Sequence, residues 1–133
     1  MDKLVPVVIN GDAHYLNYSI EVMFDVNDKY GGIREALELM SGDKRESFEV
    51  VRWFLVHMAN DGELCRRMHG YDNGPMLEEK DVSLRISPLE YATLKSAVVD
   101  AINRGYLRET ADPNQEVDLG LEEIRSKKTE AGG

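Results

Sequence analysis

The sequence of 133 residues contains one cysteine, Cys65, so an internal disulfide is excluded and a reducing compartment is favoured. It has no apolar run near the roughly 20 residues that a membrane span needs, so we expect no membrane segment. The N-terminus, Met1-Asp2-Lys3, lacks the basic start and apolar middle of a signal peptide. Together these absences predict a cytoplasmic protein.

Basic residues are also few: Lys and Arg number 16 against 25 Asp and Glu, which gives a net charge of −9. Affinity for nucleic acid depends largely on Lys and Arg displacing counterions from phosphates, so this balance argues against a nucleic-acid partner. A basic or neutral protein suits an acidic chain better. We therefore expect binding to another protein, with neither nucleic acid nor a membrane as the target.

The chain lacks the clusters that catalysis and metal binding require. It has no glycine-rich phosphate loop and no calcium loop of the EF-hand type. Cys65 and His69 are four residues apart, a spacing at which two helical side chains reach one metal ion, but two ligands do not make a site. His14 and His57 would complete it only by chance of folding. We expect no enzyme activity, no catalytic or metal-binding residue and no cofactor.

What is present begins with a β-hairpin. Residues 5–9 and 14–18 are short runs rich in β-branched and aromatic residues. Asn10-Gly11-Asp12 separates them, and the Asn-Gly pair tolerates the positive φ that tight hairpin turns require. Pro6 removes a backbone donor, so the first strand is expected at an outer edge.

Two short helices are predicted next. The first begins at the N-cap Ser19 and ends at Gly31-Gly32. Its buried stripe is predicted to comprise Ile20, Met23, Phe24 and Asn27. The second runs Ile33–Met40 and ends at Ser41-Gly42, and its short apolar stripe must pack on neighbouring elements to be stable.

The longest helical pattern follows a capping-box spacing, Asp43 to Glu46, and is predicted to end at Asn60-Asp61-Gly62. Trp53 lies in its middle among apolar residues and is predicted to belong to the core. A further turn or two over residues 63–68 allows a helix-turn-helix interpretation, with these basic residues on the second segment: Arg66, Arg67 and His69. The acidity of the chain and the shortness of that segment argue against it.

Ser87-Pro88-Leu89-Glu90 is the clearest helix start, with Ser as the cap, Pro in the first turn and Glu reaching back. This helix is predicted to end near Gly105, and residues 76–86 remain open between a loop and a short helix. The pattern predicts an α+β fold, mostly α, whose N-terminal hairpin packs on about four or five helices in a domain of residues 1–108. One core is expected to contain Val5 or Val7, Tyr15, Phe24, Leu55, Leu94 and Val98.

Residues 109–133 are predicted to be a flexible acidic tail. Seven acidic residues stand against three basic ones there, and Ala111-Asp112-Pro113-Asn114 breaks any helix. Val117, Leu121 and Ile124 share one helical face, so we predict that they bind a partner when the segment orders. The alternative is a tail that only keeps the protein soluble.

Several features recur in a recognisable order. The strand pair with its Asn-Gly turn, Tyr18-Ser19-Ile20 at a helix entry and Tyr30-Gly31-Gly32-Ile33 come first. The Trp53 helix, the Ser87-Pro88 helix and a polar segment with Asp118-Leu119-Gly120-Leu121 follow. In this order the chain resembles the small tail assembly chaperones of long-tailed (siphovirus-type) bacteriophages and prophages. The likeness covers most of the chain and includes no catalytic signature.

The resemblance implies a protein that binds the long, helical tape-measure protein, keeps it soluble during tail assembly and leaves before the virion is complete. It implies the tail tube protein as a further partner and the host bacterial cytoplasm as the location, and self-association stays open. The alternative is a small DNA-binding or regulatory adaptor protein of phage origin. Such an adaptor would be retained on heparin in a salt-sensitive manner.

Overall fold

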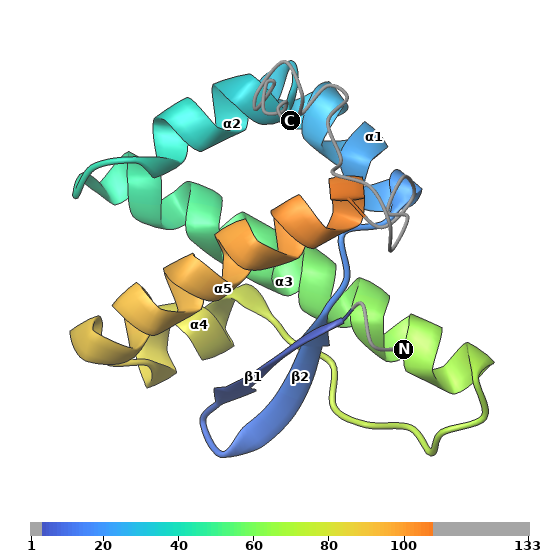
Figure 1. The fold of residues 1–133 in the computed structure, drawn as a ribbon. Coiled ribbons are helices and arrows are strands. Elements are labelled where there is room, and N and C mark those ends of the chain that lie inside the picture. Colours follow the sequence, from blue (N-terminus) through green and yellow to red (C-terminus); the bar gives the residue numbers. More distant parts are fainter. Residues whose placement is uncertain (1–3, 108–133) are drawn as a thin grey trace. The chain divides into compact units, whose positions relative to one another are not determined.

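The structure, a computed structural model, describes residues 4–107 (Figure 1). They form an N-terminal antiparallel hairpin followed by five helices, so the predicted α+β, mostly α fold is confirmed. The predicted tail of residues 109–133, with Val117, Leu121 and Ile124, lies outside the described residues, and its role stays a prediction. The elements are β1 (Val5–Ile9), β2 (Asp12–Leu16), α1 (Ile20–Tyr30), α2 (Ile33–Met40), α3 (Arg45–Met68), α4 (Glu79–Arg85) and α5 (Pro88–Leu107).

The hairpin turns where the Asn-Gly pair predicts it. Asn10 and Gly11 have φ angles of 54° and 85°, the left-handed region that this kind of turn requires. Ile9 pairs with Asp12 directly across the turn. The second strand is therefore Asp12–Leu16, which starts earlier than the predicted 14–18 because pairing resumes as soon as the turn closes.

The ends of the two short helices are confirmed. At the start of α1, Ser19 Oγ accepts a hydrogen bond from the Val22 N–H at 3.3 Å. Gly31 follows the last turn in the left-handed conformation, with φ of 94°. Helix α2 has the predicted bounds and ends at Ser41.

The predicted buried stripe of α1 is wrong. Phe24 is 54% exposed, whereas Val22 and Val26 are fully buried. The valines continue one turn later into Tyr30, whose ring packs against Phe54 of α3 with a centroid distance of 6.3 Å. Helix α1 carries apolar residues on two faces, and packing on α3 selects the face that ends in Tyr30.

Helix α3 is continuous and central. It passes through Asn60-Asp61-Gly62 without a break, so the predicted end there is wrong and no helix-turn-helix forms. It contacts β2, α1, α2 and α4. Its N-cap is Lys44, whose side chain makes no capping bond, in place of the predicted Asp43.

Gly62 allows β2 to cross α3 at close range. A Cβ atom added at Gly62 would lie 1.6 Å from the backbone oxygen of Tyr15. Nearby, the Asn17 N–H donates to the Met58 backbone oxygen at 3.1 Å, and Asn17 Nδ2 donates to Asp61 Oδ2 at 2.8 Å. The glycine is therefore needed for backbone approach, which is why it lies inside a helix that it does not end.

The last two helices begin with capping boxes. Helix α4 settles the open interpretation of residues 76–86, and its start pairs Glu78 with Asp81. At the start of α5 the predicted box forms: the Ser87 N–H donates to Glu90 Oε1 at 2.7 Å, and the Glu90 N–H donates to Ser87 Oγ at 3.2 Å. The local sequence signal therefore predicts the start of α5, whereas the sequence alone leaves the start of α4 open.

The core prediction is confirmed for most residues and wrong for Phe24. Tyr15 is only partly buried. Trp53 is also only partly buried, and its neighbour Phe54 takes the fully buried position on α3. The predicted core residues that are buried are Val5, Val7, Leu55, Leu94 and Val98.

Candidate partner-binding surfaces

The described residues contain no arrangement that resembles a metal centre. Within residues 4–107 no group of three His, Cys, Asp or Glu side chains could hold an ion, and no helix there is long and apolar enough to cross a membrane. Cys65 Sγ lies 4.0 Å from His69 Nδ1, which also contacts the Cys65 backbone oxygen at 3.0 Å. His57 instead stacks on Trp53, with ring centroids 4.0 Å apart.

The arginines of the helix-turn-helix interpretation are held by a buried carboxylate. Glu63 is 4% exposed and accepts hydrogen bonds from Arg66 Nη1 at 2.7 Å, from Arg67 Nε at 2.8 Å and from the Gly74 N–H. Burial raises the pKa of Glu63, but the hydrogen bonds from Gly74, Arg67 and Arg66 outweigh it and hold the pKa below its usual range. Arg66 also lies over the Tyr15 ring, 5.2 Å from its centroid. Both arginines therefore serve the fold.

The connection between α3 and α4 is fixed by side chains of α3. Asn60 forms two hydrogen bonds with the backbone of Leu77, one from its Nδ2 at 3.0 Å and one to its Oδ1 at 2.7 Å. Arg67 Nη2 donates to the Gly74 backbone oxygen at 3.2 Å. Leu77 is buried beneath the segment. A stretch that reads as a loop by composition is thus anchored by side chains of α3.

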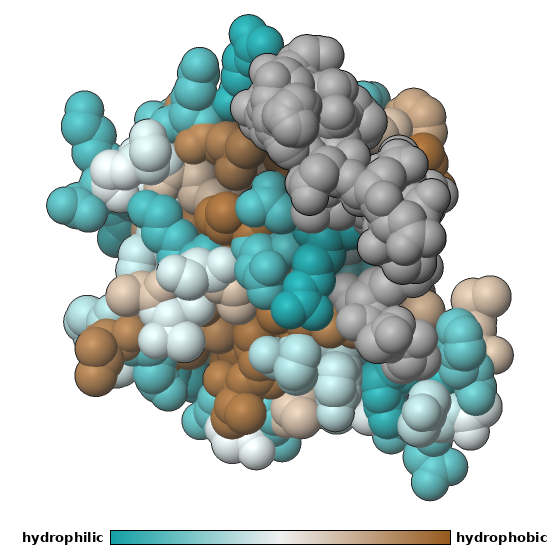
Figure 2. Space-filling view, in the orientation of Figure 1, coloured by the Kyte–Doolittle hydropathy of each residue, from teal (hydrophilic) through white to brown (hydrophobic). Residues whose placement is uncertain are grey.

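An apolar groove lies between the hairpin and the N-terminal half of α5. Its volume is about 550 Å³, and Glu90 is the one charged residue that lines it. Val8 of β1 is 65% exposed and Leu89 of α5 is 82% exposed along it. Figure 2 shows hydrophobic surface over the hairpin and the N-terminal end of α5. We call this surface the hairpin–α5 groove.

The sequence contains a sign of this groove that the alternation of inward and outward residues along a strand does not reveal. Strand β1 is apolar on both faces, since Val5, Val7 and Ile9 point inward while Val8 points outward. A strand with one solvated face usually carries polar residues there. Leu89 belongs to the predicted helix start, but nothing in a capping box requires an apolar residue at that position.

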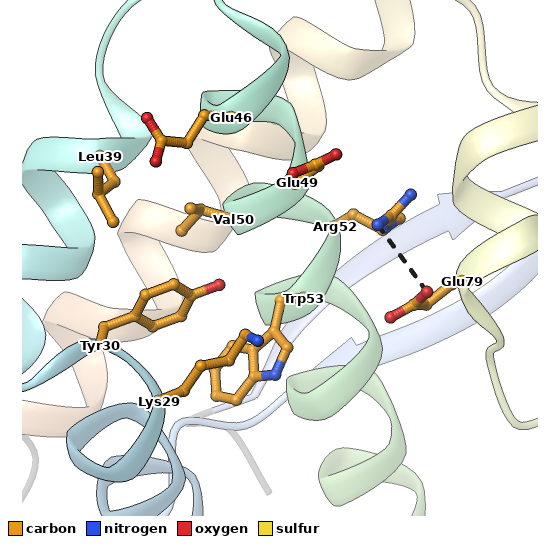
Figure 3. Close-up of a pocket in the computed structure, with 9 residues that line it drawn as sticks. All are labelled: Lys29, Tyr30, Leu39, Glu46, Glu49, Val50, Arg52, Trp53 and Glu79. Atoms are coloured by element: carbon orange, nitrogen blue, oxygen red, sulfur yellow. Dashed lines mark ion pairs between the residues drawn. The ribbon is translucent and has the colours of Figure 1, made fainter.

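A second, narrower cleft of about 230 Å³ lies among α1, α2 and α3, and Glu79 at the start of α4 also lines it (Figure 3). The rings of Tyr30 and Trp53 meet edge to face at its base, with centroids 5.4 Å apart and planes at 88°. Figure 3 shows Glu46 and Glu49 on α3, away from the two rings, with their carboxylates turned in opposite directions. Burial raises the pKa of Tyr30, with Glu49 adding to the rise and Arg52 opposing it. Trp53, predicted as core, is only partly buried and lies at the base of this cleft.

His14 is a buried titratable group within the hairpin. It is 5% exposed on β2, opposite Val7 of β1. Burial lowers the pKa of His14 below 6.5, and the nearby carboxylates of Asp12, Asp81 and Glu63 only partly offset this. The folded protein therefore favours the neutral imidazole.

Acid should weaken the fold through His14. Because its pKa is lower when folded, the unfolded chain binds more protons below 6.5, and the free energy of unfolding should fall as pH drops through that range. Urea unfolding at about pH 7.5 and about pH 5.5 should show a larger loss for the wild type than for His14→Gln, which cannot titrate. Equal losses in both proteins would assign the pH dependence to other groups.

Comparison with known proteins adds no relative to this description. The resemblance to tail assembly chaperones, which the order of the sequence features suggests, therefore stays a prediction. No protein-family model matches the chain, and no curated protein or solved structure matches it either.

Proposed function

We propose that this chain is a phage or prophage tail assembly chaperone that binds the tape-measure protein and keeps it soluble during tail assembly. The observation that carries the proposal is the hairpin–α5 groove, with Val8 and Leu89 exposed along it. Contiguous apolar surface on a soluble protein commonly marks an interaction site. The resemblance in feature order supplies the identity of the partner.

The groove suits an apolar helical segment. A helix presents apolar side chains at i, i+3, i+4 and i+7 on one stripe, and a groove of about 550 Å³ accommodates several of them. The net charge of −9 favours segments with basic flanks. A long, helical tape-measure protein offers many segments of this kind.

A DNA-binding or regulatory adaptor is less well supported. The helix-turn-helix is absent from the described residues, and Glu63 engages both Arg66 and Arg67. Heparin chromatography separates the two functions. A chaperone of this acidity should flow through at low salt, and salt-sensitive retention would favour the adaptor.

The groove is tested by co-expressing the tape-measure protein with a chain that carries Val8→Ser and Leu89→Ser. Burying one such side chain contributes about 1.5–3 kcal/mol, so the complex should weaken at least about ten-fold and less tape-measure protein should stay soluble. Both side chains are exposed, so the free variant should melt like the wild type. Leu84→Ser and Met68→Ser, at positions 80% and 87% exposed and outside the groove, should leave recovery unchanged.

The outcomes separate three statements. Undiminished recovery with the groove variant would move the binding surface elsewhere on the protein. Full recovery both with a chain truncated after Arg108 and with Val117, Leu121 and Ile124 replaced by Ser would remove the predicted tail contribution. A wild-type chain that fails to keep the tape-measure protein soluble would reject the proposed function.

A further inference from the structure

We propose that the cleft among α1, α2 and α3 receives a cationic side chain, lysine or arginine, from a bound partner protein. The inference rests on the proposed protein-binding function and adds the chemistry of the partner. The cleft is separate from the hairpin–α5 groove, since no residue lines both. A partner segment would thus be recognised by its charge here and by its apolar side chains in the groove.

The aromatic base of the cleft already accommodates an ammonium group. Lys29 of α1 places its Nζ atom 5.6 Å from the centroid of the Tyr30 ring, within the range of a cation–π contact. Lys29 is itself exposed, so its side chain can leave at small cost. Its position indicates where a cation from a partner would lie, beside Tyr30 and Trp53.

Three carboxylates line the cleft, and two of them belong to α3. Glu46 and Glu49 lie one turn apart on α3 and line the cleft. Among the described residues neither forms an ion pair. Glu49 is close enough to Tyr30 to raise the pKa of its hydroxyl. Among the residues that line the cleft, these two carboxylates are therefore outside any ion pair, while the cations are the exposed Lys29 and Arg52, which lies near Glu79.

Arg52 lines the same cleft but is directed toward α4. Its Nη1 donates to Ser83 Oγ at 2.9 Å, its Nη2 lies 3.9 Å from Glu79 Oε1, and its guanidinium lies 5.5 Å from the Phe48 ring centroid. Figure 3 shows this side chain turned to Glu79, away from Tyr30. Arg52 therefore forms no ion pair with Glu46 or Glu49, and both carboxylates can pair with a cation from a partner.

An organic cation fits better than a metal ion. Calcium takes about 6–8 oxygen ligands, and within residues 4–107 no group of three acidic, His or Cys side chains is placed to hold an ion. Leu39 and Val50 line the cleft beside Glu46, and apolar contacts of this kind suit the methylene stem of a lysine or arginine. A space of about 230 Å³ is large enough for one such side chain.

The test uses small probes, so that it does not depend on the tape-measure protein. Trp53 is the only tryptophan in the chain, so its indole N–H signal in an NMR spectrum reports on the cleft directly. Titration with N-acetyl-lysine amide or N-acetyl-arginine amide should shift this signal in a saturable way. N-acetyl-norleucine amide, which has an alkyl chain and no charge, should shift it little.

Charge variants give opposite signs. The double change Glu46→Gln and Glu49→Gln should weaken binding of the lysine probe by about two- to thirty-fold, since it removes two negative charges from the lining of the cleft. Lys29→Met removes the resident ammonium and should strengthen binding. Two control proteins carry changes at exposed charges that do not line the cleft: the double change Glu21→Gln and Glu38→Gln, and the single change Lys80→Met. Each should change the affinity for the lysine probe less than two-fold, because salt screens surface charges over a Debye length of about 10 Å at 0.1 M.

Three results would overturn the inference. They are a norleucine response equal to the lysine response, an unchanged affinity in the Glu46 and Glu49 variant, and equal effects of the two double Gln variants. None of them bears on whether the tape-measure protein is kept soluble. If the probes bind as expected while co-expression fails, the proposed function is lost and the cation site stands.

Discussion

Gly62→Ala should destabilise the protein by about 3 kcal/mol or more, although glycine to alanine inside a helix normally stabilises by up to about 1 kcal/mol. The new Cβ would lie 1.6 Å from the Tyr15 backbone oxygen, so β2 or α3 must move. Neither can move freely, because the Asn17 N–H is bonded to the Met58 backbone oxygen beside the crossing. A loss of stability, where glycine to alanine in a helix normally gives a gain, would therefore show that Gly62 contacts the Tyr15 backbone.

Urea unfolding of the wild type and the variant measures the loss in unfolding free energy. In thermal unfolding, the melting temperature should fall by about 10 °C for a domain of this size. Gly70→Ala is the matched control. Gly70 has φ of 91° but no atom within 4 Å of an added Cβ, so only backbone strain of about 1–2 kcal/mol should appear. A Gly62→Ala protein as stable as the wild type would mean that β2 does not cross α3 at this position.

Local signals gave the parts of the fold that depend on neighbours in sequence. The Asn10-Gly11 turn, the Ser19 cap, the left-handed Gly31 and the capping box of Ser87 and Glu90 all form as predicted. Each involves atoms within a few residues of one another. Their conformations are therefore set largely by short-range sterics and hydrogen bonding.

The errors arose where distant segments meet. Asn60-Asp61-Gly62 has the composition of a helix end, but Asn60 binds Leu77, Asp61 accepts from Asn17, and Gly62 admits β2. Each residue of the motif serves a tertiary contact. Likewise α1 offers two apolar faces, and the choice of Val22 over Phe24 depends on where Tyr30 meets α3. Periodicity alone does not contain that choice.

The candidate surfaces were hidden for the same reason. Val8 and Leu89 are far apart in sequence, and only the packing of the hairpin beside α5 makes one groove of them. Trp53 has the sequence context of a core residue, yet its place on α3 turns it to a cleft shared with Tyr30 and Glu49. The predicted contact residues Val117, Leu121 and Ile124 follow from spacing within one segment, a kind of pattern that a single sequence displays directly.

Glu63→Ala should cost about 2–4 kcal/mol, because removing one partner of a buried ion pair leaves the other charges without compensation. Glu63 is buried, while the side chains of Arg66 and Arg67 keep 19% and 31% of their exposure, so water partly compensates the arginines. The Gly74 N–H also loses its acceptor. Glu63→Gln, which keeps an acceptor and loses the charge, should cost about half as much.

The loss should also depend on pH. The pKa of Glu63 is lowered in the folded protein, so its contribution is present above the usual value of 4.5 and is lost as pH falls through the folded pKa. The difference in unfolding free energy between wild type and Glu63→Ala should therefore shrink in acid. Glu79→Ala, which removes an exposed carboxylate 3.9 Å from Arg52, should change stability by no more than about 0.5 kcal/mol.

Hydrogen exchange locates the effect. Loss of the carboxylate should speed exchange of the Gly74 amide and of the backbone around it, while the Leu77 amide, bonded to Asn60 Oδ1, should remain protected. Global unfolding would instead accelerate both amides equally. If Glu63→Ala matched the wild type in stability and in Gly74 exchange, the bonds of Arg66 and Arg67 to Glu63 would not stabilise the fold. The two arginines would then be candidates for a binding surface.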